Sequence, residues 1–348
     1  MIAIERTLER IAPVDADAAR RARERSDALT KPPGSLGRLE ELAAQLCAIA
    51  GDTAPRLAHR AVIVMAADHG VTAQGVSAYP REVTAQMLAN FVAGGAAINV
   101  LARRAGARVA VVDIGVDGRP VPGVLRRRIA PGTRDMTVGP AMSADEARRA
   151  VACGIAVLDA ERERGLDIVA TGDMGIGNTT PASAITAVLT GRDPSSVVGR
   201  GTGIDDATLA RKIRVVERAI DVNRPDPSDP LDVLAKVGGL EIAGLVGVIL
   251  GACAHRVPVV LDGFISGAAA LSAVRMQPAT GGYLIAAHRS AEPGHAAALG
   301  TLGLRPLLEL ELRLGEGTGA ALALPLVDAA VAVLAEMATF ESAGVSRI

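Results

Sequence analysis

Glu316 is the residue best placed for proton transfer, because it stands between two glycines in the segment 314–320, which reads LGEGTGA. A carboxylate held by close-packed backbone at the end of a strand predicts a general base. The segment also matches the dinucleotide-binding pattern G-x-G-x-x-A. That match is weak, because the pattern follows the last predicted strand and would aim a carboxylate at a pyrophosphate. A surface acid in a loop is the structural alternative.

A glycine-rich turn in residues 172–181, GDMGIGNTTP, precedes a predicted helix. Thr180 suits the N-cap of that helix and Pro181 suits its first position. Backbone amides at such a turn can hold a phosphate group. A tight strand–helix turn is the alternative, but it needs fewer glycines than this segment contains. The candidate anion-binding residues of the turn are Gly175, Gly177 and Asn178.

A second glycine-rich segment, residues 199–203, reads GRGTG and lies before a long predicted helix. Lys212, inside that helix, can reach a phosphate as a point charge. A flexible loop with a solvated lysine fits the sequence equally well, and both interpretations stay open. The candidate phosphate-binding residues of the segment are Gly201, Thr202 and Gly203.

The segment 288–295, HRSAEPGH, has two histidines but lacks the i, i+4 spacing of ligands on one helix face. No third ligand is in evident register, so we expect no metal and no cofactor. Arg289 and Ser290 fit the role of substrate-phosphate donors better. Asp68 and His69 follow a predicted strand and form either an acid–base pair or a structural hydrogen bond. The sequence has no G-x-S-x-G nucleophile pattern.

Six short apolar runs predict the buried parallel strands that position these residues. They are residues 61–67, 108–114, 167–171, 258–261, 283–287 and 308–314. The clearest helices are residues 143–164, 206–222 and 240–255. This alternation predicts an α/β fold, a six-stranded, mainly parallel, Rossmann-like sheet flanked by helices on both faces. Polar residues and glycines follow each run, and the carboxyl edge of an open α/β sheet is where ligands bind.

The composition narrows the class of protein. The chain has 348 residues, 49% of them hydrophobic, which is enough for a large α/β core. Its 37 basic and 38 acidic residues give no sign of a nucleic-acid groove. No apolar run reads as a membrane span and the amino terminus does not read as a signal peptide, so we expect a cytoplasmic protein. Aromatic residues are only 1%, so a planar ligand must lie between aliphatic side chains and backbone.

Seven segments carry a resemblance to a known family. They are residues 29–40 (LTKPPGSLGRLE), 67–71 (ADHGV), 75–84 (GVSAYPREVT), 175–180 (GIGNTT), 199–203 (GRGTG), 289–295 (RSAEPGH) and 315–319 (GEGTG). Read in order, they resemble the nicotinate-nucleotide–dimethylbenzimidazole phosphoribosyltransferases, which act in building the lower ligand of cobalamin. The resemblance covers nearly the whole chain. Two positions depart from the family, since Asp173 and Ala287 stand where it usually has Glu and Gly.

The resemblance implies a homodimer and two domains in each subunit. The large catalytic α/β domain would span residues 31–319. The small helical domain would combine residues 1–30 with residues 320–348, from both ends of the chain.

The resemblance also assigns roles to individual residues. The catalytic base falls on Glu316, with a secondary acidic role for Asp173. The benzimidazole would lie near Gln86 and Leu314. The contacts with the nucleotide phosphate would fall on the loop 201–203, Lys212 and Ser290.

The implied reaction moves the ribose 5-phosphate of nicotinate mononucleotide to 5,6-dimethylbenzimidazole. It gives α-ribazole 5′-phosphate and nicotinate, with inversion at the anomeric carbon. The pyridinium nitrogen leaves neutral, so one carboxylate is sufficient where hydrolysis of an O-glycoside needs two. A non-catalytic nucleotide-binding protein and a Rossmann-type oxidoreductase remain as alternatives.

Overall fold

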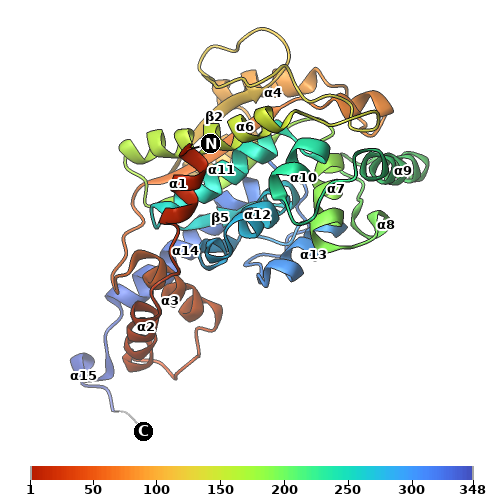
Figure 1. Cartoon of the computed structure of the whole chain (residues 1–348). Helices are drawn as coiled ribbons and strands as arrows, with labels where there is room; N and C mark the ends of the chain where they lie inside the picture. Colours follow the sequence, from red (N-terminus) through yellow and green to blue (C-terminus); the bar gives the residue numbers. More distant parts are fainter. Residues whose placement is uncertain (1, 347–348) are drawn as a thin grey trace.

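The computed structural model describes residues 2–346, and these form one parallel sheet covered by helices (Figure 1). The strand order is β3-β2-β1-β4-β5-β6, and every neighbouring pair is parallel. The strands are β1 (Arg60–Ala67), β2 (Ala107–Gly115), β3 (Leu125–Arg126), β4 (Ile168–Met174), β5 (Val259–Leu261) and β6 (Leu284–Ala286). The predicted fold class is confirmed.

One predicted strand is wrong. Residues 308–314 are not a strand, and they meet the sheet edge through an isolated bridge between His288 and Leu308. Glu311 takes a left-handed backbone conformation with φ 55°, which interrupts an extended segment. The sixth strand of the sheet is instead β3, beside β2. Its two residues are exposed, so no apolar run marks it in the sequence.

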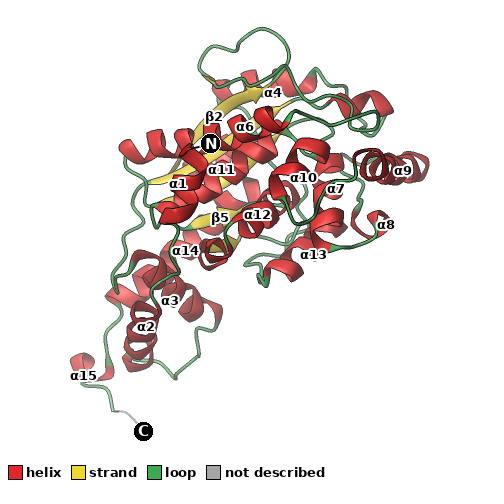
Figure 2. Cartoon of the chain, in the orientation of Figure 1, coloured by secondary structure: helices red, strands yellow, loops and turns green. Residues whose placement is uncertain are grey.

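Helices cover both faces of the sheet (Figure 2). The helices between residues 83 and 336 are α4 (Val83–Ala93), α5 (Ala97–Arg104), α6 (Ala144–Glu163), α7 (Thr179–Thr190), α8 (Pro194–Val197), α9 (Asp206–Asn223), α10 (Pro230–Val237), α11 (Leu240–Ala254), α12 (Phe264–Met276), α13 (Pro293–Leu302) and α14 (Thr318–Glu336). Of these, α8 and α9 pack on other helices. Side chains along β1 alternate between two cores, because successive residues of a strand point to opposite faces. Ile63 and Met65 pack with α6 and α11, whereas Val62 and Val64 pack on the α14 side.

The three clearest predicted helices are confirmed as α6, α9 and α11. A capping box starts α6, in which Ser143 accepts the amide of Glu146 and the Glu146 side chain accepts the amide of Ser143. Glycines let α6 pack directly on the buried α11. A methyl group on Gly154 would lie 1.9 Å from the carbonyl oxygen of Gly244, so only glycine permits this approach.

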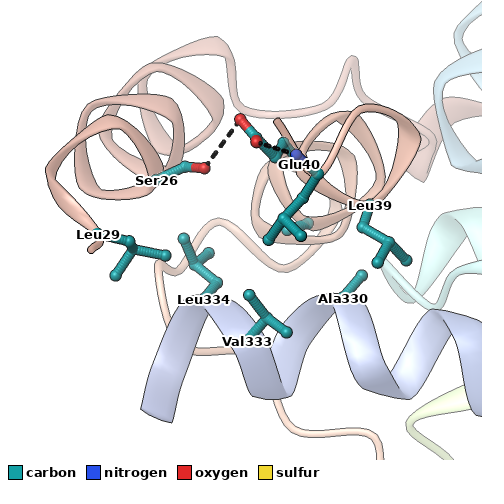
Figure 3. A pocket seen from close by; sticks show the side chains of 9 residues that line it. Ser26, Leu29, Leu39, Glu40, Ala330, Val333 and Leu334 are labelled. Atoms are coloured by element: carbon teal, nitrogen blue, oxygen red, sulfur yellow. Dashed lines mark hydrogen bonds between the residues drawn. The ribbon is translucent and has the colours of Figure 1, made fainter. Parts of the chain in front are cut away.

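The ends of the chain lie in different places. The first helix, α1 (Ile2–Arg10), packs on α6 and α11. The helices α2 (Ala16–Ala28) and α3 (Arg38–Ala50) pack together and against α14, and α15 (Phe340–Ala343) follows below them (Figure 1). Figure 3 shows the apolar contacts there, with Ser26 donating to Glu40 at 3.2 Å. The division into residues 1–30 with 320–348 and residues 31–319 stays a proposal.

From the sequence we expected no apolar run that could span a membrane, and α14 corrects this. By length and composition alone, α14 could cross a membrane. More than half of it is buried inside the protein, where it packs on β4, β5, α3 and α5. The segment Val83–Arg104 passes the same test, but a turn with left-handed Gly94 divides it into α4 and α5. Burial in the core explains the apolar composition of α14. The apolar stretch of Val83–Arg104 is only 28% buried.

Candidate active site

A cavity of about 570 Å³ lies at the carboxyl edge of the sheet. The turn after β4 and the glycine loop before α9 form two of its walls. A third wall comes from residues 311–314, the segment that was predicted as a strand. The predicted site residues that line the cavity are Asp173, Gly175, Gly177, Asn178, Gly201, Thr202 and Leu314.

The turn between β4 and α7 lies against the cavity. The helix α7 begins at Thr179, and its N-cap is Asn178. The sequence pattern predicts the N-cap at Thr180 and the first helical residue at Pro181, and both predictions are wrong. The backbone of Asn178 is already helical, and its side chain makes no cap. It donates instead from Nδ2 to Oδ2 of Asp173 at 2.8 Å. The turn is held from behind, because the amide of Ile176 donates to Oγ1 of Thr84 at 3.1 Å.

The second glycine loop is tied to two buried charged residues. The amide of Gly201 donates to Oε1 of Glu292 at 2.8 Å. The Nζ of Lys212 donates to Oγ1 of Thr179 at 2.7 Å and to the carbonyl of Gly199 at 3.1 Å. Burial lowers the pKa of Lys212 to about 8, which the charge of Glu292 partly offsets. Lys212 therefore links both glycine loops from inside the protein.

Glu316 lies in the turn that opens α14 and is only 5% exposed. Its backbone is left-handed, with φ 63°. Its backbone amide donates to the carbonyl of Asp173 at 3.2 Å. Its side-chain Oε2 accepts a hydrogen bond at 3.3 Å from the amide of Ile98, which lies at the start of α5. Burial raises the pKa of Glu316, and the Ile98 hydrogen bond opposes the shift. Glu316 lies directly behind Asp173 rather than among the cavity-lining residues.

Asp173 ends β4 and is buried at the cavity wall. Burial raises its pKa well above the ordinary value, and the charge of Asp262 adds to this effect. The hydrogen bond from Asn178 opposes the shift. Asp173 and Glu316 thus form a pair of neighbouring buried acids.

Five other predicted residues lie outside the cavity lining, namely Gln86, Gly203, Lys212, Arg289 and Ser290. Arg289 is exposed, and its guanidinium lies 3.9 Å from Glu309. Ser290 is buried, and its amide donates to Nδ1 of His295 at 2.9 Å. Gln86 is exposed on α4. Gly203 lies beside the guanidinium of Arg313, a residue of the cavity wall that the sequence did not single out.

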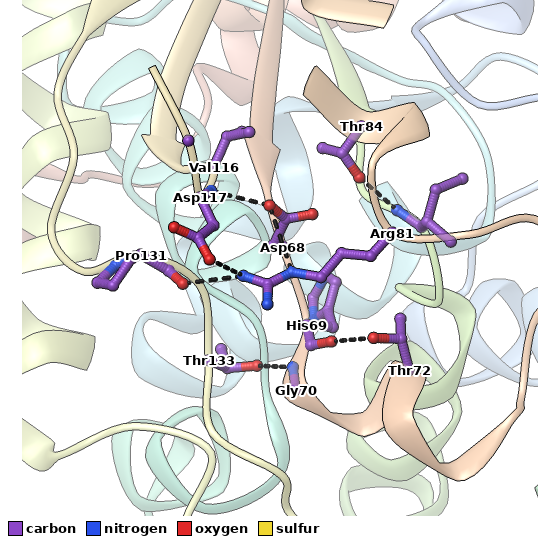
Figure 4. Close-up of polar contacts among 12 residues, drawn as sticks. Asp68, His69, Gly70, Thr72, Arg81, Thr84, Val116, Asp117, Pro131 and Thr133 are labelled. Carbon is purple, nitrogen blue, oxygen red and sulfur yellow. Dashed lines mark hydrogen bonds and ion pairs between the residues drawn. The ribbon is translucent and has the colours of Figure 1, made fainter. Parts of the chain in front are cut away.

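Asp68 and His69 do not form the hydrogen bond that the sequence suggested. The Nε2 of His69 pairs instead with Oε1 of Glu241 at 2.9 Å, from α11. Asp68 accepts the amide of Asp117 at 2.8 Å and lies 3.5 Å from the guanidinium of Arg81. Figure 4 shows Arg81 bridging Asp68, Asp117 and the carbonyl of Pro131. These contacts hold the loops after β1 and β2 in place.

Asp262, at the end of β5, is a buried acid that spacing alone did not assign to the site. Its carboxylate accepts the amides of Gly317 and Ala320, at the amino end of α14. Two observations contradict the interpretation of residues 315–320 as a dinucleotide-binding turn. Asp262 accepts the amides at the start of α14, and among the described residues 2–346 no strand leads directly into the turn. An anion of the protein already occupies the position that a pyrophosphate would need.

A parallel α/β sheet with two glycine loops and paired buried acids at its carboxyl edge fits a nucleotide-dependent transferase, and a phosphoribosyltransferase family model matches residues 11–345. The chain belongs to the nicotinate-nucleotide–dimethylbenzimidazole phosphoribosyltransferase family.

Relatives with that name support the assignment over the full length. The protein of Desulforudis audaxviator is 61% identical over 349 residues, covering 100% of this chain and 99% of the relative. The protein of Chloroflexus aurantiacus is 60% identical and covers 99% of each chain. The crystal structure of the phosphoribosyltransferase from Thermus thermophilus superposes with a TM-score of 0.91 at 50% identity. That match covers 96% of this chain and 100% of the other.

Proposed function

We propose that this enzyme transfers the ribose 5-phosphate of nicotinate mononucleotide to 5,6-dimethylbenzimidazole, with inversion at the anomeric carbon. The products are α-ribazole 5′-phosphate and nicotinate, and the reaction belongs to the assembly of the lower ligand of cobalamin. The observation that carries the proposal is the position of buried Glu316 directly behind Asp173, the acid that lines a cavity walled by two glycine loops.

The leaving group needs no acid. Its glycosidic nitrogen is part of a pyridinium ring and departs as a neutral nitrogen once the bond to the anomeric carbon breaks. The attacking benzimidazole nitrogen becomes cationic as the new bond forms, so a base must take the proton from the other ring nitrogen. Attack from the face opposite the leaving group converts the β nucleotide into an α product.

Glu316 is the base in this proposal. Its Oε2 accepts the Ile98 amide, and Oε1 takes the proton from the benzimidazole. The carboxylate also stabilises the positive charge that develops on the acceptor ring. Burial raises the pKa of Glu316, which brings its proton affinity closer to that of the group it must deprotonate. Asp173 has a secondary role toward the ribose or the heterocycle, because a carboxylate against the phosphate would repel it.

The phosphate is bound by the glycine loops and nearby donors. The proposed contacts are Gly175, Gly177, Asn178, Gly201, Thr202, Gly203, Lys212, Arg289 and Ser290. The benzimidazole lies near Gln86 and Leu314, between aliphatic side chains and backbone. Anchoring the sugar phosphate and the acceptor separately would hold the reacting atoms in line.

The setting of the enzyme is part of the proposal. It is a cytoplasmic homodimer that binds only small-molecule substrates, without nucleic acid or membrane, and it needs no cofactor and no metal. Mass detection of α-ribazole phosphate from the two substrates tests the function. A non-catalytic nucleotide-binding protein would bind the mononucleotide without forming this product, and an oxidoreductase would change the redox state of a nicotinamide cofactor instead.

A further inference from the structure

Asp262 is a buried carboxylate to which the proposed reaction gives no part. It follows β5 and is 1% exposed. Its Oδ2 accepts the amide of Gly317 at 3.1 Å and its Oδ1 accepts the amide of Ala320 at 3.0 Å. Its own amide donates to Oγ1 of Thr171 at 3.2 Å. Both oxygens therefore meet the amino end of α14, where unpaired amides and the helix dipole favour an anion.

The segment that Asp262 holds carries Glu316. A non-glycine residue keeps a left-handed backbone only where its surroundings fix it there. Two hydrogen bonds do this for Glu316, since its own amide donates to the Asp173 carbonyl and the next amide, of Gly317, donates to Asp262. The two peptide groups that flank the Glu316 side chain are thus tied to the ends of β4 and β5.

We infer that Asp262 is a positioning residue that holds Glu316 in the conformation from which it removes the proton of the acceptor base. The inference rests on the proposed function, because it takes Glu316 as that base. Asparagine at this position would have one carbonyl oxygen for two amide donors, and its NH₂ group would face the second N–H. The amino end of α14, which follows Glu316, would then lose one of the two hydrogen bonds that Asp262 accepts.

Because Asp262 titrates, its role can also be tested through the pH dependence of kcat. The groups that face it are His288, whose Nε2 lies 3.8 Å from Oδ1, and the carboxylates of Glu316 and Asp173. Burial raises the pKa of Asp262 to about 7, against the effect of the Ala320 and Gly317 amides. The charge of Glu316 also raises the pKa of Asp262. Asp262 accepts its two amides best when it is ionised, so the turn is held most firmly above the pKa of Asp262. Without this carboxylate, Glu316 alone should set the acid limb of activity, at lower pH.

The test compares Asp262→Asn with Asp113→Asn. Asp113 is the control, because it is also a buried carboxylate near the end of a strand; it accepts the amide of Val116 at 2.8 Å and pairs with Arg128 at 2.9 Å, away from the turn of Glu316. Asp262→Asn should reduce kcat by about 10- to 100-fold, the usual cost of a misplaced catalytic group. The KM for nicotinate mononucleotide should stay within about twofold, since phosphate binding is not involved. The acid limb of the kcat profile should move to lower pH.

Asp113→Asn should keep both kcat and the position of the acid limb. An Asp262→Asn enzyme with unchanged kcat, or with reduced kcat and an unmoved acid limb, would overturn the inference. If Asp262→Asn does not fold, ¹³C-carboxyl NMR of the wild-type enzyme decides instead. Asp262 should titrate together with the acid limb of kcat, and titration elsewhere would refute its role. A wild type that forms no α-ribazole phosphate would reject the proposed function itself, before any variant is compared.

Discussion

The Oε2 atom of Glu316 lies 3.3 Å from the amide nitrogen of Ile98, a residue 218 positions away in the chain. This contact places the carboxylate at the amino end of α5, while the backbone of Glu316 is tied to β4 through the Asp173 carbonyl. The proposed base is thus fixed from two separate elements. An amide donor at a helix start stabilises the ionised form, and burial opposes it.

Replacing Glu316 by Gln should remove the base without removing the shape of the site. Turnover should fall by about 10²- to 10⁴-fold, the usual contribution of a general base. Binding of both substrates should persist, which calorimetry can measure. Glu24→Gln is the control, because Glu24 is exposed and pairs with Arg20 on α2, away from the cavity. Near-normal turnover in Glu316→Gln would show that another group takes the proton.

The pH profile should reflect a base with a raised pKa. Glu316 works only when deprotonated, so activity should be present at high pH and lost as the pH falls through its pKa. Because burial raises that pKa, the midpoint should lie above about 4.3, the value of an ordinary glutamate. The kcat of the wild type, measured across the acid range, checks this. A midpoint at or below the ordinary value would contradict the assignment.

Asp173→Asn should reduce turnover less than Glu316→Gln does. Burial, together with the charge of Asp262, raises the pKa of Asp173 well above its ordinary value and so favours the neutral form of its carboxyl. Asparagine has almost the same shape and no charge, so the loss should stay below about tenfold. Steady-state kinetics of the two variants under one set of conditions gives the comparison. An equal or greater loss in Asp173→Asn would mean that its ionised carboxylate takes part in the reaction.

Lys212→Ala should raise the KM for nicotinate mononucleotide and leave that for the benzimidazole unchanged. Its ammonium ties Thr179 to the Gly199 carbonyl, so both proposed phosphate loops lose their link. Lys236→Ala is the control, since Lys236 pairs with Asp232 within α10. Nicotinate riboside provides the second readout, because it lacks the phosphate. If the wild type uses riboside and mononucleotide equally well, the glycine loops do not bind phosphate.

Much of the fold could be predicted because its strands are buried on both faces and therefore apolar. The runs at β1, β2 and β4 read clearly for this reason. The strand β3 could not be predicted, since its two residues are exposed and only its pairing with β2 defines it. Conversely, the leucines of residues 308–314 alternate with charged residues and imitate a strand, but Glu311 turns the chain out of the sheet.

The site was predictable where one segment carries its own signal, as in the two glycine loops and the Gly-Glu-Gly turn. It was not predictable where distant segments meet. Glu292 has no sequence signal that links it to Gly201, and His69 pairs with Glu241 from α11 rather than with its neighbour Asp68. Strand-end acids such as Asp262 could have been listed, but only the fold shows which one holds the turn of Glu316.

The central claim is transfer of the ribosyl phosphate with inversion, and the product itself tests it most directly. Purified enzyme is incubated with nicotinate mononucleotide and 5,6-dimethylbenzimidazole in the presence of a metal chelator, and the product is analysed by mass spectrometry and NMR. We predict α-ribazole 5′-phosphate, with nicotinate released in equal amount and full activity despite chelation. A β-configured product, hydrolysis to ribose 5-phosphate without transfer, or activity that returns only with a divalent ion would contradict the account.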